Sequence, residues 1–199
     1  MFPVRKRIFD VSLSLAIIVT LAPIYLLLCI FIKLDSPGPI LFKQRRIGIW
    51  KREFHILKFR TMRIDAPKDM PTHLLEKPDA YITRSGKFLR KTSLDELPQF
   101  INILKGEMSL IGPRPALWNQ FDLIEERDKY QANDVLPGLT GLAQINGRDE
   151  LPIEVKAKID GGYVEHMSMM LDLKIMAWTT VYVFRREGVK EGEKAAPKL

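Results

Sequence analysis

Two adjacent carboxylates, Asp95 and Glu96, lie among cationic residues close to the point where a helix is expected to begin. Carboxylates are side chains that can attack phosphoryl groups and bind hard metal ions such as Mg²⁺. The apolar residues after them have the i, i+3, i+4, i+7 spacing of a buried helical face, and Gly106 then provides a stop signal. The members of this expected face are Leu97, Phe100, Ile101 and Leu104.

Two local structures are open for this acidic segment. These residues alone favour the simpler one, in which Ser93 caps the helix and Glu96 reaches back to its amide, because Ser-x-x-Glu is a common capping box. Pro98 argues against it, because as the fifth helical residue it lacks the amide that would bond the carbonyl of Leu94. In the alternative, the helix begins later or kinks, and Asp95 and Glu96 lie at its mouth.

The composition is that of one domain, with room for an appendage, and a strong positive charge. The chain has 199 residues, enough to bury a core, and a formal net charge of +7. Such a charge favours partners that carry phosphate: nucleic acid, anionic lipid or a nucleotide substrate. The single cysteine, Cys29, excludes a disulfide framework and a cysteine-based zinc site. His55, His73 and His166 are too far apart to show metal-ligand spacing.

Residues 11–32 form an uncharged, mostly apolar segment, about 33 Å long as a straight helix and therefore long enough to cross a bilayer. It is too long for a signal-peptide core, and no small-residue cleavage site follows, so we expect it to stay on the protein. Pro23 at its midpoint removes a backbone hydrogen bond, and cations flank both ends, whereas a spanning helix favours one basic flank. A spanning helix and a re-entrant hairpin within one leaflet both remain open. The flanking cations are Arg5, Lys6, Arg7, Lys33, Lys43, Arg45 and Arg46.

Residues 40–44 and 53–60 are predicted as two strands, and Gly48 in their connector favours a β-hairpin. Alternation along the second strand places Lys58 and Arg60 on one side, where two cations could hold a diphosphate. Solvated charge on an edge strand is the more ordinary interpretation of such a pair.

Residues 112–115, Gly-Pro-Arg-Pro, predict a rigid corner in which both prolines fix φ. Such a rigid backbone would hold Arg114 in a fixed direction, which suits bidentate binding of a phosphate by its guanidinium. An arginine in a proline-rich turn is also ordinary. The glycine-rich residues 137–148 end in Arg148 but match neither a P-loop nor a dinucleotide fingerprint. They are therefore predicted as a turn-rich loop.

The rest of the chain is predicted as helices and loops. Helices are expected over residues 116–129, 152–167 and 171–184, and the last of these would be either interfacial or part of the core. A surface loop is expected over residues 64–78, where prolines lie among charged residues. In the helix expected over residues 116–129, the apolar face is predicted to consist of Leu117, Phe121 and Ile124.

Short segments in a fixed order carry a resemblance that covers nearly the whole chain. The chain resembles the bacterial monotopic phosphoglycosyl transferases, the sugar transferases that begin lipid-linked glycan assembly, and looks most like members of capsule and O-antigen pathways. One departure is Ala22-Pro23, where family members often carry Ser-Pro, which leaves the sharpness of the helix break open. The matching segments are residues 6–10 (KRIFD), 36–39 (SPGP), 58–62 (KFRTM), 90–99 (RKTSLDELPQ), 104–109 (LKGEMS), 112–115 (GPRP), 137–141 (PGLTG), 146–148 (NGR) and 171–174 (LDLK).

The resemblance implies a reaction in which polyprenyl (undecaprenyl) phosphate attacks the sugar-1-phosphate carried by UDP, giving polyprenyl-diphospho-sugar and UMP. It implies an aspartyl phosphosugar intermediate on Asp95 and a requirement for Mg²⁺. Glu96 would hold the metal together with Asp95 or manage the proton of the lipid phosphate. The cations implied as contacts for phosphate, nucleotide or sugar are Lys58, Arg90, Arg114 and Arg148.

The implied fold is α+β and mainly helical, with a small cytoplasmic domain that contains a β-hairpin and interfacial amphipathic helices. Residues 1–35 would form a re-entrant membrane helix hairpin, residues 36–188 the catalytic domain and residues 189–199 a loose polar tail. The enzyme would lie on the cytoplasmic face of the bacterial inner membrane, in contact with lipid. Its partners would be polyprenyl phosphate and a UDP-sugar, by analogy an N-acetylated hexosamine, with no nucleic acid. A homodimer is compatible with the resemblance.

A function of another class explains part of the sequence, namely a basic membrane-anchored scaffold that binds nucleic acid or anionic lipid. It accounts for the charge and the apolar segment but leaves the acidic pair and the 112–115 corner without a purpose. Binding that weakens with salt, with no UMP formed, would support it. An ordinary nucleotide-sugar glycosyltransferase is disfavoured, because such enzymes usually carry an Asp-x-Asp metal motif, which this sequence lacks.

Overall fold

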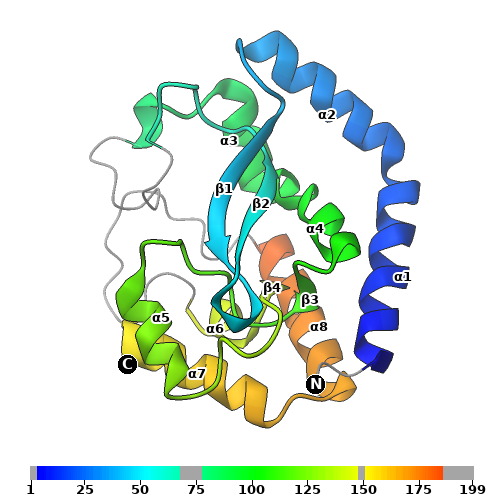
Figure 1. Ribbon diagram of the computed structural model, residues 1–199. Helices are drawn as coiled ribbons and strands as arrows, with labels where there is room; N and C mark the ends of the chain where they lie inside the picture. Colours follow the sequence, from blue (N-terminus) through cyan, green and yellow to red (C-terminus); the bar gives the residue numbers. More distant parts are fainter. Residues whose placement is uncertain (1–3, 68–77, 148–150, 186–199) are drawn as a thin grey trace.

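The computed structural model describes residues 4–67, 78–147 and 151–185 and is mainly helical, with two small two-stranded sheets (Figure 1). This architecture confirms the predicted α+β class with its predominance of helix. The expected tail, the site candidate Arg148 and most of the expected loop at residues 64–78 lie outside the described residues. The α-helices are α1 (Val4–Thr20), α2 (Ala22–Asp35), α3 (Arg84–Thr92), α4 (Gln99–Lys105), α5 (Phe121–Asp128), α6 (Leu142–Ile145), α7 (Ile153–Glu165) and α8 (Met169–Arg185). The 3-10 turns are η1 (Ile49–Lys51), η3 (Pro78–Ala80) and η4 (Leu94–Glu96), and the strands are β1 (Leu41–Ile47), β2 (Glu53–Phe59), β3 (Ser109–Ile111) and β4 (Gly138–Thr140).

The N-terminal apolar segment is broken into two helices, α1 and α2, which meet at a bend of 64°. Pro23 lies in the first turn of α2, where its missing amide leaves no helical bond unmade, so the second helix starts there. In the described part of the chain, no single helix is long and apolar enough to cross a membrane, although the bent pair together passes that test of length and composition. The pair forms an arc along the right and upper edges of Figure 1.

The buried stripe of α1 is polar rather than apolar. Lys6, Asp10 and Ser14 recur at i, i+4 and i+8 and are at most 3% exposed. Lys6 forms an ion pair with Asp172 of α8, and Asp10 accepts a hydrogen bond of 2.7 Å from the hydroxyl of Ser109 in β3. The helix is thus docked through these polar contacts together with Phe9, Leu13, Ile17 and Ile18, which are partly buried and pack against the main core. The large apolar side chains that it leaves exposed are Val4, Ile8, Leu15 and Val19.

Strands β1 and β2 form the predicted hairpin, antiparallel and paired from Leu41 opposite Phe59 to Ile47 opposite Glu53. On β2, Phe54 and Ile56 point into the core because they alternate along one face of the strand. The outer edge of the strand is closed by Asn102 of α4, whose side chain accepts from the amide of Leu57 and donates to the carbonyl of His55. The hairpin is therefore joined directly to the helix that follows the acidic pair.

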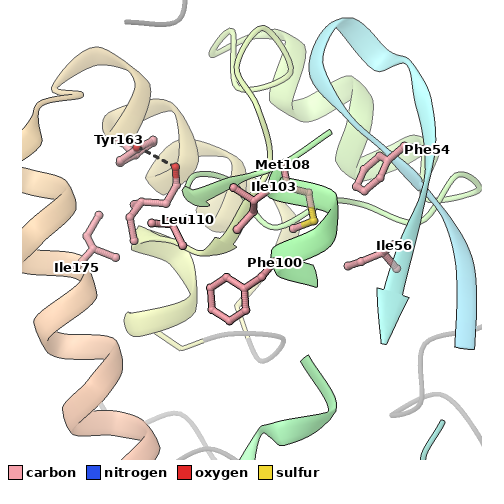
Figure 2. Packing of buried hydrophobic residues seen from close by; sticks show 9 residues of the cluster. Phe54, Ile56, Phe100, Ile103, Met108, Leu110, Tyr163 and Ile175 are labelled. Atoms are coloured by element: carbon pink, nitrogen blue, oxygen red, sulfur yellow. Dashed lines mark hydrogen bonds between the residues drawn. The ribbon is translucent and has the colours of Figure 1, made fainter. Parts of the chain in front are cut away.

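The main core lies between β2, α4, β3, α7 and α8, and Figure 2 shows its central side chains. Tyr163 of α7 is 1% exposed, and its single hydroxyl proton is shared between Oδ1 of Asp172 at 2.8 Å and the carbonyl of Ile111 at 3.1 Å. The predicted buried face of α4 is partly wrong. Phe100 is buried as expected. Ile101 and Leu104, which were also predicted to be buried, are partly exposed, and Ile103, which was not predicted, is fully buried instead. The buried residues of the cluster are Phe54, Ile56, Phe100, Ile103, Met108, Leu110, Ile111, Tyr163 and Ile175.

The second sheet was not predicted, because each of its strands is only three residues long. Strands β3 and β4 run parallel, with Ser109 opposite Gly138 and Ile111 opposite Thr140. Gly138 is required there, because a Cβ at this position would lie 2.1 Å from the amide nitrogen of Gly112. The residues expected to form a turn-rich loop thus include a strand and the short helix α6.

The helices predicted in the C-terminal half are present, with corrected limits. Helix α5 starts at Phe121 rather than at residue 116, and Phe121 is 62% exposed, so it is not part of the buried face. Leu117 is buried just before that helix, and Ile124 is buried within it. Helices α7 and α8 lie close to the ranges predicted for them.

Candidate active site

The acidic pair lies on η4, a single turn between α3 and α4. Helix α3 ends at Thr92, and Ser93 then adopts a left-handed conformation with φ of 56°. The capping box favoured by the sequence is wrong, because Ser93 makes no side-chain cap bond to the turn that follows. A capping Ser needs an extended backbone, which the left-handed Ser93 does not have. The alternative is confirmed: α4 begins after Pro98, so the missing amide of Pro98 leaves no helical bond unmade.

The side chain of Glu96 is held by two of the predicted cations. Its Oε1 accepts from the Nζ of Lys58 at 2.8 Å and lies 3.5 Å from the Nη2 of Arg114. Lys58 comes from the end of β2 and Arg114 from the 112–115 corner, so segments far apart in sequence converge here. The side chains are 26%, 17% and 37% exposed for Glu96, Lys58 and Arg114 respectively, which leaves the cluster accessible to a charged substrate.

Asp95 lies beside Glu96 in a partly buried position. Burial raises the pKa of its carboxyl to about 6; the positive charges of Lys58 and Arg90 oppose this rise, and the negative charge of Glu96 adds to it. Arg90 is anchored by a hydrogen bond of 2.9 Å from its Nε to the hydroxyl of Thr61. The structure therefore brings together five of the six predicted site residues, and the sixth, Arg148, is outside the described residues.

Arg60 is not part of this site, so neither interpretation of the pair it was predicted to form with Lys58 holds for it: it is neither positioned to share a diphosphate nor a solvated charge on the edge strand. It follows β2 and is 4% exposed. Its guanidinium donates to the carbonyls of Ser36 and Pro37 at 2.6 and 2.7 Å. Arg60 therefore secures the turn after α2, and Gly38 suits that turn because its φ of 121° is one that other residues rarely adopt.

The 112–115 corner is supported by a residue that the sequence did not single out for this role. Arg46 of β1 donates from Nη1 to the carbonyl of Pro115 at 2.9 Å, while its Nε and Nη2 bond the side-chain oxygen of Gln44. In the sequence Arg46 was one of many flanking cations. Nothing in its spacing indicated a contact with a segment about seventy residues away.

The donor chemistry of the acidic pair fits a magnesium ion that is shared with a substrate. Among residues 4–67, 78–147 and 151–185, no three side chains of the His, Cys, Asp and Glu types gather into a metal-binding group. Magnesium is commonly bound by one or two carboxylates plus substrate phosphates, with water in its other positions. Asp95 and Glu96 supply that number of carboxylates, and Lys58, Arg90 and Arg114 surround them with positive charge.

Comparison with known proteins shows which family the chain belongs to. The family model described as bacterial sugar transferase matches residues 2–186. The chain is 39% identical over 189 residues to the sugar transferase EpsL of Bacillus subtilis, covering 94% of this chain and 91% of that protein. It is also 39% identical over 189 residues to a UDP-glucose:undecaprenyl-phosphate glucose-1-phosphate transferase of Xanthomonas campestris, covering 92% of this chain but 39% of that protein. An Escherichia coli protein of the same name is 38% identical over 181 residues, with 87% of this chain and 39% of that protein covered.

These matches confirm the resemblance found in the sequence and the prediction of a transferase enzyme. The chain spans about two fifths of the two glucose-1-phosphate transferases, and the region shared with them contains η4 and the 112–115 corner. The family model matches the full described length, and the fold brings together Asp95, Glu96, Lys58 and Arg114. The chain therefore belongs to the bacterial sugar transferase family.

Proposed function

We propose that the protein transfers sugar-1-phosphate from a UDP-sugar to polyprenyl phosphate, with Asp95 as the covalent nucleophile. The observation that carries this proposal is the position of the acidic pair. Both carboxylates lie, partly buried, on a single 3-10 turn rather than in a helix cap, and three cations surround them. A carboxylate that attacks a diphosphate is repelled by its negative charge, so such cations are required beside it. The names of the Xanthomonas and Escherichia relatives, which specify UDP-glucose and undecaprenyl phosphate, support the two substrates.

The reaction divides into two displacements at one phosphorus atom. In the first, a carboxylate oxygen of Asp95 attacks the phosphorus that bears the sugar, and the bond to UMP breaks with its electron pair leaving on UMP. In the second, an oxygen of polyprenyl phosphate attacks the same phosphorus, which restores the Asp95 carboxylate and gives polyprenyl-diphospho-sugar. Lys58, Arg90 and Arg114 would offset the charge of the phosphates in both steps. Magnesium, held by Asp95 and Glu96, would supply further positive charge to the diphosphate.

Glu96 is proposed to have a second role beside metal binding. Its Oε1 contacts Lys58 and Arg114, so the carboxylate holds two cations that would otherwise repel each other next to Asp95. When substrate phosphates enter, these cations can turn to them, and Glu96 becomes available to accept the proton of the lipid phosphate.

The function is tested by incubating the protein, in its membrane and with Mg²⁺, with undecaprenyl phosphate and a panel of UDP-sugars while UMP release is measured. We expect release with at least one sugar, and a fall in rate as the pH drops below about 6, because the raised pKa of Asp95 leaves its carboxyl protonated in acid. The panel must include UDP-glucose beside the N-acetylated hexosamines expected from the resemblance, since the named relatives specify glucose and give no support to an acetamido group. Salt-sensitive binding of lipid or nucleic acid without UMP would instead favour the scaffold.

We further propose that α1 and α2 enter the membrane as a re-entrant hairpin from the cytoplasmic face. The bend of 64° and the row of exposed apolar side chains on both helices support this placement. To test it, Cys29→Ala is combined with Arg5→Cys or with Lys43→Cys, two exposed positions on opposite flanks of the pair. Both flanks should react with a membrane-impermeant thiol reagent from the cytoplasmic side alone. Reaction of either flank only from the outside would mean that the chain crosses the bilayer. The exposed apolar residues of α2 are Ile24, Leu26, Leu27, Ile30, Phe31 and Leu34.

A further inference from the structure

An ion pair lies buried between α5 and α7, outside the site described above. Arg127 of α5 is 3% exposed and Asp160 of α7 is 1% exposed. The Nε and Nη2 of Arg127 both donate to Oδ2 of Asp160, at 2.9 and 2.6 Å. A buried ion pair is weak support for stability, because an apolar pair of similar volume often stabilises a fold as well or better. The presence of this pair therefore calls for a role that an apolar pair could not fill.

The third nitrogen of this guanidinium, Nη1, is bonded to a residue of the candidate active site. Nη1 of Arg127 donates to the main-chain carbonyl of Arg114 at 2.9 Å. A guanidinium is planar, and its five N–H groups have fixed directions. The two bonds to Asp160 therefore set the plane of the group, and with it the direction in which Nη1 meets the carbonyl of Arg114.

Arg114 needs such support because of how the 112–115 corner is built. The rings of Pro113 and Pro115 fix their own φ, and Pro115 confines ψ of Arg114 to the extended range, but the exact direction of each peptide plane is set only when its carbonyl is bonded. The amide of Gly138 bonds the carbonyl of Pro113, Arg127 bonds that of Arg114, and Arg46 bonds that of Pro115, each at 2.9 Å. Three successive carbonyls are thus held by three different elements, which fixes the direction in which the side chain of Arg114 leaves the backbone.

We propose that Arg127 and Asp160 form a positioning pair that orients Arg114 toward Glu96 and the phosphates of the substrate. This inference rests on the proposed function. Arg114 approaches the Oε1 of Glu96 at 3.5 Å from the corner that the pair supports. Arg127 itself acts through the backbone, so it has no direct contact with the reacting atoms in this scheme.

The first test is Arg127→Lys, which keeps the charge beside Asp160 but cannot make two fixed bonds to the carboxylate and a third to the corner. Transfer of radiolabelled sugar-phosphate to undecaprenyl phosphate should fall in kcat/KM by about 100-fold, the size of effect that a small misplacement of a catalytic group can cause. The matched control is Arg63→Lys, in which an exposed arginine is bonded to Asp65 through Nε and Nη2. This control should retain the wild-type kcat/KM.

The same substitution is then made in an Arg114→Lys background. If Arg127 acts through Arg114, adding Arg127→Lys there should lower kcat/KM by less than about twofold, whereas independent effects would multiply. A merely structural role would give the same fold-loss in both backgrounds. That result, or a wild-type kcat/KM for Arg127→Lys alone, would overturn the positioning role while the wild-type enzyme still releases UMP. An absence of UMP release from the wild type would instead remove the proposed function.

A second variant guards against loss of the fold. The double substitution Arg127→Met with Asp160→Leu removes both charges together, so no unpaired charge is left buried, and its thermal midpoint should stay close to that of the wild type. It should nevertheless show the same loss of kcat/KM as Arg127→Lys, because the carbonyl of Arg114 has lost its donor. A folded double variant with wild-type activity would overturn the inference.

Discussion

Replacement of Asp95 by asparagine is expected to abolish UMP release and to prevent attachment of sugar-phosphate to the protein. Asparagine has nearly the same shape as aspartate, but its amide oxygen is a poor nucleophile, so the first displacement cannot occur. Loss of a covalent nucleophile lowers the rate by about 10⁴-fold or more. The measurement is incubation with a UDP-sugar radiolabelled in its sugar, without polyprenyl phosphate, followed by denaturation and peptide mapping of the label.

The matched control for this experiment is Asp134→Asn, which changes an exposed carboxyl outside the candidate site. It should take up label and release UMP like the wild type. A label that maps to a peptide without Asp95, or one that persists in Asp95→Asn, would contradict the proposed nucleophile. Release of UMP without any trapped label would argue for direct attack of the lipid phosphate on the UDP-sugar.

Among the substitutions proposed for this chain, replacement of Lys6 by methionine is expected to cause the largest loss in free energy of unfolding. Lys6 is 3% exposed and pairs with Asp172, which is 2% exposed and also accepts a hydrogen bond of 2.8 Å from the hydroxyl of Tyr163. Removal of the cation leaves a carboxylate buried without its ion-pair partner, which typically costs about 3–5 kcal/mol in free energy of unfolding. For a chain of this size the thermal midpoint should fall on the order of 10 °C, measured on protein extracted in mild detergent.

Two further variants separate charge burial from other causes. Arg5→Met removes an exposed cation one residue earlier on α1 and should leave the thermal midpoint near that of the wild type. Lys6→Met combined with Asp172→Leu removes the two charges of this ion pair and should regain part of the lost stability, since Tyr163 still has the carbonyl of Ile111 as an acceptor. The recovery should be incomplete, because the buried carboxyl of Asp10 also loses the nearby positive charge of Lys6. A double variant no more stable than Lys6→Met would show that the ion pair is not the cause.

Helix α1 is also bonded to the segments that carry the candidate site. Through Lys6 and Asp10, α1 is bonded to α8 and to β3, the strand that leads into the 112–115 corner. Arg7 of the same helix donates to the carbonyls of Ile103 and Leu104 at 2.7 and 3.2 Å, at the end of α4. The placement of α1 therefore constrains both segments that flank the candidate site.

The features that could be predicted from the amino-acid sequence are those that depend on a few neighbouring residues. Pro98 argues against a regular helix through the acidic segment, because its ring removes an amide whatever surrounds it, although the Ser-x-x-Glu spacing favoured the capping box that the structure lacks. Alternation on β2 and Gly48 in its connector predict the hairpin, and the spacing of apolar residues predicts α7 and α8. The ordered motifs likewise predict the family, because recognising them requires only the residue types in order and not the contacts that each residue makes in the fold.

Only the tertiary structure decided which partner each polar side chain takes. The sequence offers Glu96 the amide of Ser93, yet Glu96 pairs with Lys58 and Arg114, because the folded chain brings stronger, charged donors within reach. Lys58 near the end of β2 and Arg60 just after it are two residues apart in the sequence but contact different parts of the protein. The polar stripe of α1 and the parallel pairing of β3 with β4 were missed for the same reason, since contacts between distant segments leave no mark on local spacing.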